Sequence, residues 1–383
     1  MWNNKKTPVY ALVTGFILWI SGVSLGIGGM ISSTSVPTSG TISYPGGAWL
    51  HTNGTGLYNS ANNEARLWTT VVHTGQGFHL TDSDLQNIAS MGFKGIRFFV
   101  YWSLAQPTGP ALNQINTAYF ASGTGEPGNN VIDNLVDLCA NHGLYIILCP
   151  AWTSTFGVPT WAVSQGVGGS ETGTSDLLNS HNNPTIQQGV ANLYAFMAAR
   201  YASKWNVCFE SFNELSSESS PCSAAERQRF ADFNNLWISA IEANEGSNSH
   251  IKIIELIWDS SDVNYCCYSP VLSGSHANII LATHSYALVR ATSSQATSLS
   301  QTWADFIHGL NYPWMDTEYS HYLGGGLSGL QQGTNALVNN GAIGWGYFLY
   351  DASSNSDNGA NVNNASNKSS ILAILQPYMN KTS

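Results

Sequence analysis

Residues 80–102 of the chain read LTDSDLQNIASMGFKGIRFFVYW, a helical segment followed directly by a strand. Thr81 precedes an acidic turn, as an N-cap residue does at the start of a helix. Gly95–Tyr101 is then a continuous apolar run interrupted only by Arg97. Such runs are typical of strands that are buried on both faces of a parallel sheet. The stretch therefore predicts one helix and strand unit of an α/β fold.

The same alternation of apolar runs and helical segments continues from about Thr69 onward. Eight parallel strands close a (β/α)₈ TIM barrel, so we expect that fold. An open doubly wound sheet is the alternative, but no G-x-G-x-x-G motif begins a helix here. The eight predicted strands are Thr70 to His73, Gly95 to Tyr101, Leu144 to Pro150, Asn206 to Phe212, Ile251 to Trp258, Asn278 to His284, Tyr312 to Thr317 and Ile343 to Leu349.

The first 65 residues differ from the rest of the chain. Lys5 and Lys6 precede an uncharged run, Val9–Ile31, which as a helix spans about 34 Å, enough to cross a bilayer. We interpret residues 1–31 as a signal peptide or membrane anchor, with a buried core helix as the alternative. Residues 32–65 are predicted to be a Ser/Thr/Gly-rich linker and a short β-rich arm, and residues 66–383 the barrel. We therefore expect a protein that is secreted or anchored to the outer cell surface through residues 9–31.

Charge and cysteine content exclude some classes of function. The chain has 13 Lys and Arg residues and a formal net charge of -10, which argues against a nucleic-acid partner. Cys222, Cys266 and Cys267 lie in polar contexts where disulfides can form, whereas the other three cysteines lie in apolar runs and are predicted to be buried thiols. These three are Cys139, Cys149 and Cys208. No Cys-x-x-Cys pair points to a zinc site.

Polar side chains close several of the predicted strands. Active sites of such barrels lie at the C-terminal strand ends, where the sequence places Arg97, Asn213, Glu214, His284, Tyr286, Glu318 and Trp345. Two carboxylates on opposite sides of one barrel opening suit glycoside cleavage, in which one protonates the leaving oxygen and the other attacks the sugar or activates water. A surface ion pair is the alternative for either carboxylate alone. Glu214 and Glu318 are therefore the candidate catalytic pair.

The order and spacing of these residues resemble family 5 of the glycoside hydrolases, the endo-β-glucanase and β-mannanase group. The resemblance covers roughly Thr69 to Trp345. It rests on the stretch quoted first and on GLYIILCPAW, KWNVCFESFNEL, THSY, PWMDTEY and IGWGYFLYD.

The resemblance implies a retaining mechanism without cofactor or metal. Glu214 would be the acid/base and Glu318 the nucleophile, with carboxyl groups about 5–5.5 Å apart. Arg97 and Tyr286 would keep Glu318 ionised. Among the remaining residues, Asn213 would bind the sugar 2-hydroxyl, Trp345 would form the floor of the subsite beside the scissile bond, and His284 would support the cleft. From its position alone, Trp152 is a further candidate to line the cleft.

One position departs from the family pattern. The family has Asp-x-His before an aromatic residue at the end of the third strand, whereas this chain has Cys149-Pro150-Ala151-Trp152. Ala151 stands where the His would be, which puts the preference for glucose over mannose in doubt. His79, shortly after the first strand, is a candidate to fill the gap.

We expect an endo-β-1,4-glucanase that acts as a monomer on β-glucan or a related polysaccharide. A β-mannanase or a transglycosylase would share the mechanism. A non-catalytic carbohydrate-binding barrel is an alternative from another class, although a pure binder needs no paired acid and nucleophile. A metal-dependent hydrolase would use His73, His79, His284 or Asp316 as ligands.

Overall fold

The computed structural model describes nine segments of the chain. The N-terminal apolar run 9–31 and Trp152 lie outside them, so the predictions for both stay untested. No helix in the described segments is long and apolar enough to cross a membrane. These segments are residues 48–72, 78–151, 157–168, 174–218, 221–257, 269–321, 324–351, 361–364 and 366–379.

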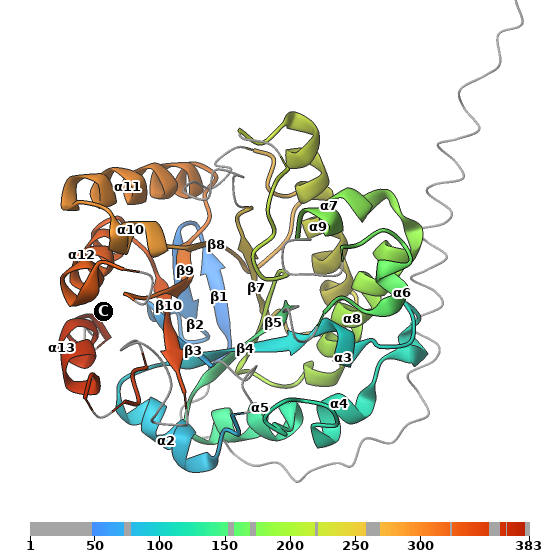
Figure 1. Cartoon of the computed structure of the whole chain (residues 1–383), viewed down its shortest axis with the longest axis horizontal. Helices are drawn as coiled ribbons and strands as arrows, with labels where there is room; N and C mark the ends of the chain where they lie inside the picture. The colour runs from blue at the N-terminus through green and yellow to red at the C-terminus, as the bar shows by residue number, and fades with distance from the viewer. Residues whose placement is uncertain are drawn as a thin grey trace, which may run out of the picture. The chain divides into compact units, whose positions relative to one another are not determined.

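Parallel strands close into a barrel in the order β10-β3-β4-β5-β6-β7-β8-β9 (Figure 1). The closed order confirms the predicted (β/α)₈ fold. Each observed strand overlaps its predicted range, with ends that differ by a few residues. The strands are β3 Leu67–Val72, β4 Gly95–Tyr101, β5 Tyr145–Ala151, β6 Val207–Glu210, β7 Ile251–Glu255, β8 Ile279–His284, β9 Trp314–Tyr319 and β10 Gly344–Tyr350.

Helices surround the barrel on its outer side (Figure 1). Thr81 caps the first of them in a capping box with Asp84, as the sequence predicts. Asn183 caps α8, whose first residue is Pro184. The helices are α2 Asp82–Ser90, α3 Trp102–Ala105, α4 Thr117–Ser122, α5 Ile132–Asn141, α6 Thr160–Val163, α7 Thr174–Asn179, α8 Pro184–Tyr201, α9 Ala224–Glu242, α10 Tyr286–Arg290, α11 Ser293–Gly309, α12 Gly326–Asn339 and α13 Lys368–Met379.

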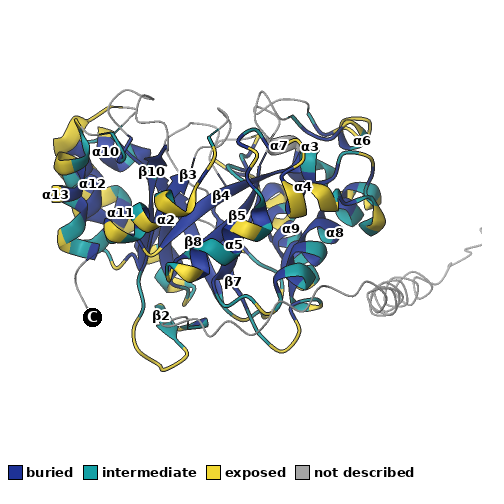
Figure 2. Cartoon of the chain, turned by 90° about the horizontal axis from the view of Figure 1, so that it is seen from below, coloured by how far each residue is buried: buried dark blue, intermediate teal, exposed yellow. Residues whose placement is uncertain are grey.

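A short antiparallel hairpin, β1 Leu50–Asn53 and β2 Gly56–Asn59, covers the N-terminal end of the barrel. Leu50 and Leu57 pack in one apolar cluster with side chains from the strand starts, among them Leu67 and Ile251. The predicted β-rich arm is therefore a hairpin that closes the end of the barrel opposite the predicted site. Figure 2 shows the hairpin strand β2 beneath the buried strands.

Alternate strand residues face the helices and the barrel interior. In β4, Ile96, Phe98 and Val100 belong to the outer apolar cluster with the helices, so Arg97 and Phe99 face inward. The predicted buried thiols are confirmed: Cys139, Cys149 and Cys208 are free and buried. Cys222 is disulfide-bonded, as its polar context predicts.

Candidate active site

Arg97 lies at the centre of the barrel interior and is fully buried. Its Nε donates to Glu210 at 2.6 Å, and its Nη1 donates to Glu318 at 2.8 Å. Its Nη2 donates to Asn213 Oδ1 at 2.7 Å and to the Cys149 sulfur at 3.2 Å. One guanidinium group on β4 therefore contacts side chains from β5, β6 with the residues after it, and β9, because its donors form a rigid planar fork.

Glu318 receives two hydrogen bonds that favour its ionised form. Besides Arg97, the Tyr286 hydroxyl donates to Glu318 Oε1 at 2.8 Å. Burial raises the pKa of Glu318, while His284, Arg97 and the Tyr286 hydrogen bond lower it. The side chain is 11 % exposed. The interactions that the sequence predicted for Arg97 and Tyr286 are thus present, and they partly offset the effect of burial.

Glu214 follows β6 at a sharp turn with φ of +53°, in the left-handed region that is uncommon for residues other than glycine. Its side chain is 42 % exposed. Its Oε1 lies 3.0 Å from His284 Nδ1, and no guanidinium group of the described residues donates to it. Although part of the side chain is exposed, the surrounding protein removes water from around the carboxyl and raises its pKa, which Arg97 partly opposes. Glu214 therefore has the more accessible carboxyl of the pair and fewer donors that stabilise its charge.

The two carboxyl groups meet across the barrel opening. One oxygen of Glu214, one oxygen of Glu318 and a ring nitrogen of His284 all lie within 4.8 Å of one another. This proximity suits retaining glycosidases, whose two carboxyl groups lie about 5–5.5 Å apart, rather than inverting enzymes, which need room for a water at about 6.5–9.5 Å.

His284 ends β8 and is fully buried. Burial lowers the pKa of its imidazole to about 4, so the ring is neutral near neutral pH. A neutral ring with a proton on Nδ1 can donate to Glu214 Oε1.

Two buried carboxylates, Glu210 and Glu255, were missed by the sequence reasoning. Glu210 is the last residue of β6 and pairs with Arg97. Glu255 is the last residue of β7, and its Oε1 lies 3.4 Å from His284 Nδ1. A signal for both was present, because each is an ionisable residue within an apolar run, where period-two alternation places it inside the barrel.

The prediction for Trp345 is wrong. Its side chain is fully buried, and its ring stacks on Trp68 with centroids 4.0 Å apart and contacts Tyr378 of α13 edge-on. It therefore lies between the barrel and an outer helix, where no sugar can reach it. The half-buried aromatic residue of β10 on the inner side is Phe348, three positions later.

The strands β3, β4 and β5 contribute apolar side chains beside Arg97. Phe348 packs against this cluster, and the Arg97 guanidinium lies 5.0 Å from the centre of the Phe99 ring. His79, the candidate to fill the gap left by Ala151, is exposed, and its Nδ1 lies 3.1 Å from the Gly128 carbonyl oxygen, so this role stays a prediction. The cluster consists of Val71, Phe99, Tyr101, Cys149 and Ala151.

The site offers two sets of possible cation ligands in the described residues: Glu210, Glu255 and His284, and Glu214, His284 and Glu318. Arg97 already neutralises a member of each set and would repel a divalent cation. Of the ligands predicted for a metal enzyme, Asp316 accepts instead from Ser285 and Thr283, and His73 lies outside the described residues. The donor set therefore fits proton and glycosyl transfer better than metal chemistry.

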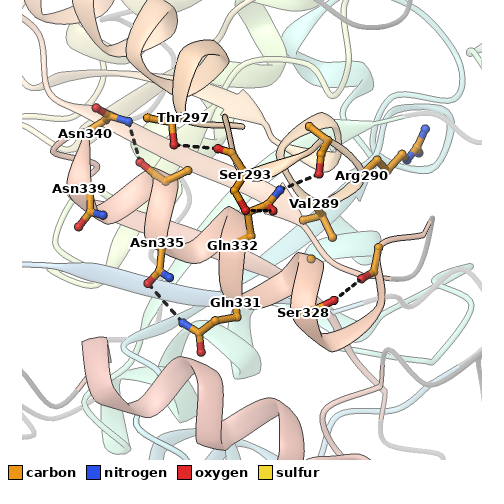
Figure 3. A pocket seen from close by; sticks show the side chains of 14 residues that line it. Val289, Arg290, Ser293, Thr297, Ser328, Gln331, Gln332, Asn335, Asn339 and Asn340 are labelled. Carbon is orange, nitrogen blue, oxygen red and sulfur yellow. Dashed lines mark hydrogen bonds between the residues drawn. The ribbon is translucent and has the colours of Figure 1, made fainter. Parts of the chain in front are cut away.

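A separate hollow of about 560 Å³ lies among α10, α11 and α12 (Figure 3). Its lining is rich in amide and hydroxyl groups, including those of Gln331, Gln332 and Asn335. Gln332 is already bonded to the backbone of α10 and the turn after it. Neither Glu214 nor Glu318 lines this hollow, so we assign it no part in the chemistry.

Several solved structures share the fold of this chain. The endoglucanase catalytic domain from Thermobifida fusca superposes with a TM-score of 0.56 at 17% identity, covering 87% of this chain and 98% of that one. A broad-specificity endoglucanase from Clostridium acetobutylicum gives 0.57 at 14% identity, covering 79% and 91%. An endogalactoceramidase gives 0.61 at 15% identity, covering 84% and 78%.

At these identities the structures establish the fold alone. No curated protein matches the chain. The family model described as cellulase (glycosyl hydrolase family 5) matches residues 58–354, a range that contains both strand-end carboxylates and all eight barrel strands. The chain therefore belongs to glycosyl hydrolase family 5 and is a glycoside hydrolase.

Proposed function

We propose that the protein is a retaining endo-β-1,4-glucanase, with Glu214 as the acid/base and Glu318 as the nucleophile. One observation supports this assignment most strongly. The two carboxyl groups approach within 4.8 Å, and both Arg97 and Tyr286 donate to Glu318. The pair is therefore close enough for double displacement, and its two members are held in different electrostatic surroundings.

In the first step, the ionised Glu318 attacks the anomeric carbon of the bound sugar. The bond from that carbon to the glycosidic oxygen breaks, and the proton of Glu214 passes to the leaving oxygen. Arg97 and Tyr286 hold the attacking carboxylate in place. Asn213, positioned by Arg97 through its Oδ1, can offer its Nδ2 group to the sugar 2-hydroxyl.

In the second step, Glu214 is ionised and takes a proton from water as the water attacks the anomeric carbon. The bond to Glu318 breaks, which restores the carboxylate and releases the sugar with its original β configuration. The neutral ring of His284 is a hydrogen-bond partner for Glu214 through both steps.

The proposed substrate follows from family membership and from the endoglucanases among the similar structures. Ala151 leaves the β-mannan alternative open, because it lacks the imidazole that the family pattern places beside the sugar. We also propose that the enzyme acts outside the cell. The uncharged run at 9–31 and the disulfide at Cys222 support this location.

A reducing-sugar assay on carboxymethylcellulose, mixed-linkage glucan, galactomannan and xylan tests the substrate. We expect the largest kcat/KM on a β-1,4-glucan, whereas preference for galactomannan would make the protein a mannanase. Proton NMR of the first product tests the mechanism. The β anomer should form first, and an initial α anomer would contradict the roles of both carboxylates.

A further inference from the structure

Glu255 lies directly behind Glu214 in the barrel. Its Oε2 accepts the backbone N–H of Glu214 at 2.8 Å, and its Oε1 lies 3.4 Å from His284 Nδ1. The side chain is 1 % exposed, so it is too deep to contact a sugar in the opening. Glu255 therefore contacts the backbone of Glu214 and the imidazole of His284, which itself lies beside the Glu214 carboxyl.

The backbone contact occurs at the point where β6 ends and the chain turns. Glu214 has a φ of +53°, a conformation with a cost for a residue that carries a Cβ, and such costs persist where neighbouring groups enforce them. A carboxyl oxygen of Glu255 can accept this N–H in both the protonated and the ionised form of the side chain. This contact stabilises the turn that directs the Glu214 side chain toward the opening.

The position of Glu255 is itself fixed by the barrel. Its backbone N–H donates to the Ser211 hydroxyl at 3.1 Å, and Ser211 N–H donates to the Ile253 carbonyl. The carboxyl group is thus held between two paired strands. Its burial and the nearby Glu214 carboxyl raise its pKa well above the usual range, which is expected where two carboxyls face each other.

We propose that Glu255 is a positioning residue for acid catalysis, which fixes the backbone of Glu214 and the ring of His284. The proposal rests on the role of Glu214 as acid/base. Loss of Glu255 should therefore impair only the reactions that need a proton donated to the leaving group. A residue needed merely for folding would affect all substrates alike.

The test compares two leaving groups on the same sugar, an oligosaccharide and 2,4-dinitrophenol, which departs without protonation. Glu255→Ala should lower kcat/KM on the oligosaccharide by about 10- to 100-fold, a part of the roughly 10²- to 10⁴-fold that general acid catalysis contributes. On the dinitrophenyl glycoside the change should stay within about 3-fold. Glu255→Gln, whose amide oxygen can still accept the Glu214 N–H, should recover most of the loss. The inference is overturned by equal losses on both substrates or by no loss on the oligosaccharide.

Glu214→Ala and the double variant Glu214→Ala/Glu255→Ala complete the experiment. If Glu255 acts through Glu214, the second substitution adds nothing to the first on the oligosaccharide. An additive loss would overturn the inference. If Glu214→Ala itself showed no dependence on the leaving group, the proposed role of Glu214 would be wrong. If Glu214→Ala showed a dependence on the leaving group but Glu255→Ala did not, the positioning role of Glu255 alone would be wrong.

Discussion

The two halves of the inner barrel differ in the side chains that they contribute. Strands β6 to β9 and the residues that follow them contribute Glu210, Glu214, Glu255, His284 and Glu318. Strands β3 to β5 contribute the apolar cluster of Val71, Phe99, Tyr101, Cys149 and Ala151, with Phe348 of β10 packed against it. Arg97 projects from β4 of the apolar half and donates to Glu210 and Glu318 of the acidic half.

We propose that this contrast separates chemistry from substrate recognition. The acidic half matches the family pattern at Asn213, Glu214, His284, Tyr286 and Glu318. The apolar half differs from the family pattern, because Cys149 and Ala151 stand at the positions where that pattern has Asp and His. Burial raises the pKa of the Cys149 thiol well above the usual range, so the substitution replaces a charged group with a neutral one. If the two halves are functionally separate, substitutions in the acidic half should change kcat and substitutions in the apolar half should change KM.

The largest effect is expected from the nucleophile. Glu318→Gln keeps the size of the side chain but cannot attack, so kcat/KM should fall by about 10⁴-fold or more, as in other hydrolases that lose a catalytic residue. Steady-state kinetics on an oligosaccharide measures the change. Glu64→Gln, at an exposed glutamate paired with Arg66 outside the site, should keep full activity. A Glu318→Gln variant with more than a tenth of the activity would refute the assignment.

Arg97, which joins the halves, should matter most for stability. Arg97→Met leaves Glu210 and Glu318 buried without their cation, which should lower the free energy of unfolding by about 3–5 kcal/mol. Arg200→Met removes the half-buried partner of Asp133 and should cost about 1 kcal/mol or less. Urea unfolding of both variants measures the difference. Equal decreases in the free energy of unfolding would show that the buried Arg97 stabilises the fold no more than the half-buried Arg200 does.

The imidazole of His284 should titrate far from the ordinary histidine range. Its pKa is lowered to about 4 by burial, so its ring should stay neutral while exposed histidines gain protons near pH 6.5. Because the unfolded chain binds this proton more readily, the contribution of His284 to stability is complete above about pH 6.5 and is lost as pH falls toward 4. NMR titration, with His284→Gln to assign the signal, tests this. A midpoint near 6.5 would contradict a buried neutral ring.

The smallest effect is expected in the apolar half. Phe348→Ala removes the inward-facing aromatic ring of β10, and KM for an oligosaccharide should rise by about 10-fold, the scale of one aromatic contact, with little change in kcat. Trp345→Phe, on the outer side of the same strand, should leave KM unchanged. If Phe348→Ala changed kcat alone, this residue would take part in the catalytic step, and the two halves would not be functionally separate.

The sequence predicts the barrel well because each strand is a continuous apolar run between helices with clear caps, such as Thr81 before α2. The same continuity conceals which face of a strand points inward. In Gly344–Tyr350 both faces are buried, so the sequence cannot choose between Trp345 and Phe348, and packing against α13 decides. Glu210 and Glu255 were missed because they fall inside the longer predicted strands Asn206 to Phe212 and Ile251 to Trp258, whereas they are the last residues of β6 and β7.

We propose that Glu318 forms the covalent bond to the sugar, although four carboxyl groups lie in the same site. A 2-deoxy-2-fluoro-β-glycoside with dinitrophenolate as leaving group slows the second step and should trap the intermediate, which peptide mass spectrometry can locate. One added glycosyl group is expected on the peptide that contains Glu318. A label on Glu210, Glu214 or Glu255 would contradict it.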